Sequence, residues 1–153
     1  MAGSETTRRR PPPTVIGLLA LLALLVVGAF QGGIAMVADP LKPLGMTVDF
    51  LERAPVHSYF WPGLFLLGIA SASALTFAGI LFGWRWRWAA AIEEKAGHRW
   101  PWLGAIAIGA VLLVFEVVEL FLVPFHPVMH PLLIAGSLAL IGLPLTRSAR
   151  AHL

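Results

Sequence analysis

The chain of 153 residues contains no cysteine. This absence excludes disulfide bonds, thiolate metal ligands and thiol redox chemistry. Charged residues are scarce as well, at 12% against about 25% in a typical soluble domain. Since 58% of the residues are hydrophobic and the mean hydropathy is +0.82, the chain has too little polar surface to cover a globule in water. We therefore expect it to reside mostly in lipid.

Motifs for several common activities are missing too. There is no phosphate-binding loop, no Ser/His/Asp arrangement and no nucleotide fingerprint. The net charge of +3 does not indicate nucleic acid, because the basic residues stand at the ends of apolar runs and form no single face. The sequence requires no cofactor, and it favours a non-enzymatic protein over an enzyme.

Four apolar runs are present, and a membrane-spanning helix needs roughly 20 such residues. We predict an all-α integral membrane bundle of four transmembrane helices with short loops. The predicted spans cover residues 14–38, 60–83, 103–123 and 131–146. The fourth run is short and carries Pro144 in its last turn, so a buried, tilted or re-entrant segment is the alternative there. Residues 1–13 are predicted to be a disordered cytoplasmic tail, and residues 147–153 a second cytoplasmic tail.

Basic residues fix the predicted orientation, because they gather on the cytoplasmic side of membrane proteins. Only Lys42 and Arg53 fall between the first two spans. The other side holds Arg8, Arg9, Arg10, Arg85, Arg87, Lys95, Arg99, Arg147 and Arg150. Both termini are therefore predicted to be cytoplasmic. The chain is rich in Ala, Leu, Gly and Pro and has nine Arg against two Lys, a bias that fits a GC-rich bacterial genome. With the apolar runs, this predicts a multi-pass protein of the bacterial plasma membrane.

The N-terminal segment allows one alternative interpretation. Basic residues, an apolar run and small residues at 27–29 are also the pattern of a cleaved signal peptide. The apolar run continues to Ala38, which is longer than a usual signal core, so an uncleaved first span is preferred.

Tryptophan and arginine alternate from Trp84 to Trp88. Indole rings favour the headgroup region of a bilayer, so this stretch is interpreted as an anchor at the cytoplasmic boundary. Arg85 and Arg87 are expected to contact anionic lipids. A docking site for an acidic partner is the alternative.

The segments between the spans carry weaker signals. Residues 47–53 are predicted to form a short interfacial helix, and residues 89–99 a helix that ends at Gly97. Small residues four apart predict close helix packing in the lipid. These pairs are Gly28 and Gly32, Gly68 and Ala72, Gly79 and Gly83, and Ala105 and Gly109.

Two acidic residues, Glu116 and Glu119, interrupt the third apolar run. Being three residues apart, they share one helix face. A charge near the membrane centre costs about 2.5–3.5 kcal/mol on insertion scales, so this face is predicted to point into the bundle. With Gln31 of the first span, the pair is a candidate intramembrane polar or ion site. The alternative is interhelical hydrogen bonding to Gln31, Ser71, Ser73 or Thr76.

Two histidines, His126 and His130, follow the third run in a proline-rich turn. Imidazole and carboxylate groups together suit Zn, Fe, Ni or Cu. Glu119, His126 and His130, joined by Asp39 or His57 of the outer loop, are therefore a candidate metal site at the outer surface. Haem ligation by two histidines and simple interfacial histidines in a tight turn are the alternatives.

Several short motifs together resemble a group of small four-helix bacterial membrane proteins of unknown function, common in actinobacteria. The resemblance spans about residues 28–143 and implies four helices but no activity. It rests on Gly32-Gly33, Asp39-Pro40, Leu44-Gly45-Met46, residues 60–64, and Glu116 with Glu119 before a proline-rich turn. The Trp/Arg alternation and the two histidines are not features of that group.

Three functions are compatible with this sequence. The first is a non-enzymatic accessory or structural subunit that assembles with itself or with a larger membrane complex. The second is a small oligomeric transporter, coupled to ions or protons through Glu116 and Glu119. The third is a membrane enzyme acting on a lipid or a quinone beside the same residues.

Overall fold

The computed structural model describes residues 11–84 and 86–151, and this part of the chain is helical, without a strand. The predicted all-α class is confirmed. Most of the predicted N-terminal tail and Arg85 lie outside the described residues. The helices are α1 (Pro13–Ala38), α2 (Phe60–Phe82), α3 (Ala90–Ala96), α4 (Trp100–Leu122), α5 (Met129–Leu145) and α6 (Arg147–Arg150), with short 3-10 turns at Pro43–Gly45, Val48–Leu51 and Arg87–Ala89.

Proline and glycine set the helix ends. Pro13 and Pro101 stand in the first turns of α1 and α4, where a missing N–H costs no helical hydrogen bond. Gly83 ends α2 with a φ of 64°, and Gly97 ends α3 with a φ of 65°. This left-handed conformation is easily reached only by glycine. The predicted stop at Gly97 is confirmed.

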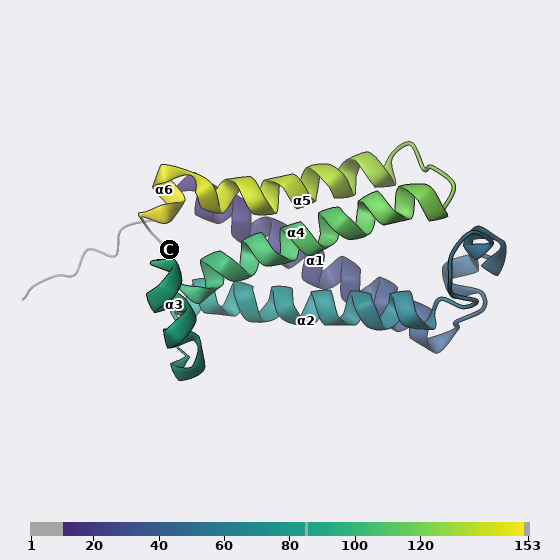
Figure 1. Ribbon diagram of the computed structural model, residues 1–153, viewed down its shortest axis with the longest axis horizontal. Helices are drawn as coiled ribbons and strands as arrows, with labels where there is room; N and C mark the ends of the chain where they lie inside the picture. The colour runs from purple at the N-terminus through teal and green to yellow at the C-terminus, as the bar shows by residue number, and fades with distance from the viewer. Residues whose placement is uncertain (1–10, 85, 152–153) are drawn as a thin grey trace, which may run out of the picture.

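The four long helices lie side by side as two hairpins (Figure 1). One hairpin is α1 with α2 and the other is α4 with α5; α2 also packs on α4, and α1 on α5. The short helices α3 and α6 lie at one end of the bundle, and residues 39–59 form a loop at the other (Figure 1). At the α6 end, the hydroxyl oxygens of Thr14 and Ser148 are 3.0 Å apart. The start of α1 is thus hydrogen-bonded to the last helix.

Three helices, α1, α2 and α4, are long and apolar enough to cross a membrane. Many of their apolar side chains face outward, while a narrow core joins the four long helices. That core comprises Leu18, Leu22, Ile69, Ala105, Ile108, Leu112 and Leu140. Such a surface indicates a multi-pass membrane protein. Helix α5 has 17 residues, a length of about 25 Å at 1.5 Å per residue, so its crossing of the membrane stays a prediction.

Glycines allow the helices to approach closely at particular crossings. A Cβ atom added at Gly33 of α1 would lie 2.9 Å from the carbonyl oxygen of Gly63 in α2. One added at Gly109 of α4 would lie 2.8 Å from the carbonyl oxygen of Ser137 in α5. By contrast, Gly28 and Gly68 of the predicted pairs have no neighbour within 4 Å of such an atom. Close packing is present, but the α1–α2 contact uses Gly33 and Gly63.

At the end of the bundle that holds α3, side chains from the start of α4 and from Arg99 just before it bind neighbouring backbone carbonyl groups. The Arg99 guanidinium donates from Nη2 to the carbonyl oxygen of Gly83 at 2.9 Å. The indole of Trp100 donates to the carbonyl oxygen of Trp84 at 2.9 Å, and that of Trp102 to the carbonyl oxygen of Pro144 at 2.7 Å. These contacts satisfy carbonyl groups that a helix end leaves without an internal partner.

The opposite end is a loop organised around Tyr59. Its hydroxyl donates to the carbonyl oxygen of Thr47 at 2.9 Å, and its N–H donates to the carbonyl oxygen of Pro40 at 2.9 Å. Burial of the ring, together with the negative charges of Asp49 and Glu119, raises the pKa of the Tyr59 phenol above its ordinary value. The predicted short helix in residues 47–53 is present as the turn Val48–Leu51.

Candidate metal centre

The acidic pair lies on α4, near the end of the bundle that carries the 39–59 loop. At 1.5 Å per residue, Glu116 is about 8 Å and Glu119 about 12 Å from the middle of α4. Glu116 is 2% exposed, whereas Glu119 is partly exposed. The prediction that this helix face turns inward is therefore met fully by Glu116 and partly by Glu119.

His130 approaches the acidic pair from α5. The turn before α5 is shaped by His126, whose Nδ1 accepts hydrogen bonds from the N–H groups of Val128 at 3.4 Å and Met129 at 3.2 Å. The carbonyl oxygen of His126 accepts from the N–H of His130 at 3.4 Å. These bonds form the first turn of α5. His130 is 4% exposed and lies on the face of α5 that meets α4.

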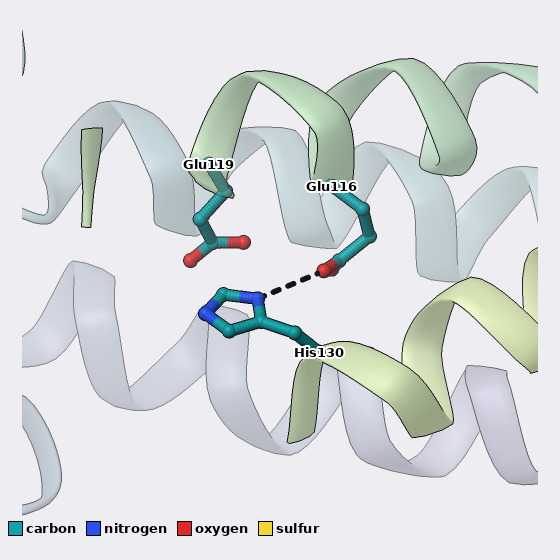
Figure 2. A group of neighbouring side chains, drawn as sticks. All are labelled: Glu116, Glu119 and His130. Atoms are coloured by element: carbon teal, nitrogen blue, oxygen red, sulfur yellow. Dashed lines mark hydrogen bonds and ion pairs between the residues drawn. The ribbon is translucent and has the colours of Figure 1, made fainter. Parts of the chain in front are cut away.

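Glu116 and His130 are in direct contact. The Nδ1 atom of His130 is 3.2 Å from Oε2 of Glu116, and Figure 2 shows Glu119 extending from the next turn of α4 toward the same imidazole. One ligand atom from each of the three residues lies within 4.8 Å of the others. The ring of Phe125 stacks on the imidazole, with 5.5 Å between centroids. Two helices thus bring two carboxylates and one imidazole together.

The spacing of these atoms suits a transition-metal ion. Bonds of about 2.0–2.2 Å to nitrogen and oxygen place neighbouring ligands about 2.8–3.6 Å apart in octahedral or tetrahedral geometry. The distance of 3.2 Å between His130 Nδ1 and Glu116 Oε2 falls in this range. A bound ion would draw all three ligand atoms to within about 4.2 Å. Rotation of the partly exposed Glu119 side chain can supply that contraction.

The charges of these side chains also favour a divalent cation at this position. The buried carboxylate of Glu116 and the partly exposed carboxylate of Glu119 repel each other when both are charged, unless a positive charge compensates them. A divalent cation held by two carboxylates and a neutral imidazole gives a complex without net charge. The imidazole nitrogen favours a first-row transition ion over Mg²⁺ or Ca²⁺, which prefer oxygen ligands.

The structure places the other candidate residues elsewhere. The side chain of Gln31 is exposed on α1, and that of His126 is exposed in the turn before α5. Asp39 ends α1 and accepts the N–H of Lys42 at 3.1 Å, and His57 is exposed. We expected metal ligands at Glu119, His126 and His130. In the structure Glu119 and His130 lie together with Glu116, and His126 lies outside this cluster.

The hydroxyl groups expected to bind the glutamates have other surroundings. Ser71 donates to the carbonyl oxygen of Leu67 in its own helix at 2.8 Å. Thr76 packs against Gly104, where an added Cβ would be 2.8 Å from its hydroxyl oxygen. Ser73 is buried, and its hydroxyl has no hydrogen-bond partner among the described residues. The interhelical bond of Glu116 goes instead to His130.

Comparisons with protein-family models, with curated proteins and with solved structures give no match for this chain. The resemblance to small four-helix bacterial membrane proteins thus stays a prediction.

Proposed function

We propose that this protein is a bacterial membrane protein that binds a divalent first-row transition-metal ion at Glu116, Glu119 and His130. One observation carries the proposal: the buried contact of 3.2 Å between His130 Nδ1 and Glu116 Oε2, with Glu119 one turn away. The predicted transporter, coupled to ions through the same acidic pair, is compatible with this proposal. Its cation site would then lie in the hairpin of α4 and α5.

The proposed topology is four spans with both termini in the cytoplasm. Supporting it, α1 begins and α6 lies at the same end of the bundle (Figure 1). That end also holds the basic residues Arg87, Lys95, Arg99, Arg147 and Arg150 among those described, against Lys42 and Arg53 at the other. The positive-inside tendency makes the former end cytoplasmic. Glu116, Glu119 and His130 then lie toward the outer surface.

Access to the proposed site is from that outer surface. Glu119 is partly exposed, and Phe125, which covers the imidazole, is 62% exposed in the turn between α4 and α5. An ion arriving from outside would meet Glu119 first and reach Glu116 and His130 after a small displacement of Phe125. The deeper pair, shielded from water, would hold the ion more strongly because a lower dielectric constant strengthens charge interactions.

Metal titration of the purified full-length chain tests the proposal. Calorimetry with Zn²⁺ and Mn²⁺ should show saturable binding of one ion per chain, and His130→Ala should weaken it at least about tenfold. His126→Ala is the matched control, because this histidine belongs to the same turn but lies outside the cluster. Equal binding by the wild type and the His130→Ala variant would overturn the proposal.

A second function is favoured by the same hydrogen bond if no ion binds. The Glu116–His130 contact would then serve to join α4 to α5 in an accessory or structural bundle, which assembles with itself or with a larger membrane complex. In that case Glu116→Gln should lower the abundance of the assembly while Zn²⁺ leaves the thermal unfolding of the wild type unchanged. Native mass spectrometry of the protein purified gently from its own membrane would identify the assembly.

A further inference from the structure

A groove lies between α3 and the beginning of α4, at the end of the bundle that we propose to be cytoplasmic. It is lined by Ala91, Ile92 and Lys95 of α3 and by Leu103 of α4, and its volume is about 440 Å³. The lining is apolar except for the Lys95 ammonium group. Helix α3 lies across the end of the bundle and does not run along the long helices (Figure 1).

The orientation of α3 is set by the face that is turned away from the groove. Glu93 accepts the backbone N–H of Trp100 at 2.9 Å through Oε1, which fastens α3 to the first turn of α4. Ala91 and Ile92 precede Lys95 by four and three residues, so both share with Lys95 a face that differs from that of Glu93. Ile92 is 49% exposed on that face. A large aliphatic side chain and a lysine are thus presented together beside Leu103.

We infer that the groove between α3 and α4 binds an anionic phospholipid, with its phosphate at Lys95 and an acyl chain against Ala91, Ile92 and Leu103. Charge complementarity supports this occupant. Arg87, Lys95, Arg147 and Arg150 are exposed at this end of the bundle, and Glu94 is the exposed acidic residue of α3. A surplus of positive charge at the headgroup level attracts anionic lipid.

The apolar lining favours a phospholipid over a free phosphate ion as the occupant of the groove. A phosphate ion would gain only from the lysine and would leave Ile92 and Leu103 in contact with water. A phospholipid covers these side chains with its chain while the ammonium group remains at the interface, as long basic side chains do at membrane surfaces. This site differs from the lipid contacts predicted for Arg85 and Arg87, of which Arg87 is exposed in the turn before α3.

Native mass spectrometry of the full-length protein, with phosphatidylglycerol and phosphatidylcholine added in equal amounts, tests the inference. The wild type should retain phosphatidylglycerol in preference. Lys95→Gln should lower this preference about fivefold, the effect of one basic residue near an anionic surface. Ile92→Asn should lower retention of both lipids. Lys42→Gln, a lysine at the opposite end, is the matched control and should change neither.

Three outcomes would overturn the inference. Equal retention of the two lipids by the wild type would remove the role of charge. An unchanged preference in the Lys95→Gln variant would place the lipid elsewhere on the surface. Release of bound phosphatidylglycerol by excess inorganic phosphate would show a free-phosphate site in which the acyl chain plays no part. Circular dichroism of each variant establishes that the helices are retained.

Discussion

The Nδ1 atom of His130 lies 3.2 Å from Oε2 of Glu116, and both side chains are almost fully buried. The contact joins α5 to α4 across 14 residues of sequence that include the exposed turn 124–128. Because both side chains are buried, a partner lost by either group is poorly replaced by water. The two residues should therefore be interdependent for stability as well as for ligand binding.

Removing only one member of this pair is expected to be more harmful than removing both. His130→Leu should lower the free energy of unfolding by about 3–5 kcal/mol, because Glu116 would be left buried without its partner. The double variant with Glu116→Leu should recover much of that loss, since apolar groups suit the site. Unfolding of the four proteins in mixed detergent micelles, combined as a double-mutant cycle, measures the coupling.

One result of the double-mutant cycle would contradict this interaction. If the two single variants lose amounts that simply add in the double variant, the residues do not interact in the folded protein. Measurements must be made in the presence of a chelator, so that metal binding does not contribute to the wild type.

Glu119 should matter more for metal affinity than for stability. Its side chain is partly exposed, and no hydrogen bond or ion pair of its side chain is seen among the described residues. Glu119→Gln should therefore change the free energy of unfolding by less than about 1 kcal/mol in the metal-free state. The same change should weaken Zn²⁺ binding about tenfold or more, because a charged ligand is lost. A variant that binds Zn²⁺ as tightly as the wild type would remove Glu119 from the ligand set.

The crossing of α1 and α2 should not tolerate a side chain at Gly33. Its added methyl group would be 2.9 Å from the carbonyl oxygen of Gly63, so Gly33→Ala must move the helices apart. We expect a loss of about 1–3 kcal/mol in detergent unfolding experiments. Gly28→Ala is the control, because nothing lies within 4 Å of its added methyl group. That variant should be neutral or more stable, since alanine favours a helix; equal effects would contradict the crossing geometry.

The absence of cysteine makes the proposed topology easy to test. Single cysteines introduced at Ser148 and at Asp49 would each be the only thiol in the protein. Both positions are exposed. In intact cells, a membrane-impermeant maleimide should label Asp49→Cys but not Ser148→Cys. After the cells are opened, both should react. Labelling of both positions in intact cells would mean that α5 or another long helix does not cross the membrane.

Tyr59 should confer a dependence of stability on alkaline pH. Its folded-state pKa is raised by burial and by the nearby charges of Asp49 and Glu119. Below the unfolded pKa of about 10, both states are protonated and the contribution of the phenol is complete. As the pH rises further, the unfolded chain loses its proton first, so stability falls until the folded pKa is passed. The wild type should thus lose more stability above pH ~10 than Tyr59→Phe does. Identical profiles would exclude this role.

Much of the fold could be predicted because its signals are local. Apolar run lengths, Pro13 and Gly97 are enough to place helices within a few residues. Helix α4 begins at Trp100, three residues before the predicted span, because the first turn of a helix accommodates Pro101. Inward-facing acidic residues could also be predicted, since lipid disfavours their charge.

The partners of these residues depend on helix rotation and could not be predicted from spacing. Gln31 is exposed because the buried face of α1 passes through Ala29 and Gly33 instead. The different roles of His126 and His130 follow from the conformation of the turn, which the sequence does not specify. His126 accepts backbone N–H groups at the start of α5, and His130, one helical turn later, points into the bundle. A spacing of four residues near a helix start was the available signal.

The three side chains of the proposed metal site all belong to the hairpin of α4 and α5, and this has a consequence for how the protein is made. Glu116 and Glu119 leave the ribosome before His130 does. A lone α4 entering the bilayer would carry both acidic groups at a free-energy cost, which is larger for Glu116 because it lies nearer the middle of the helix. We therefore expect the membrane insertion machinery to hold α4 until the chain has been synthesised beyond His130, and then to release α4 and α5 into the lipid together.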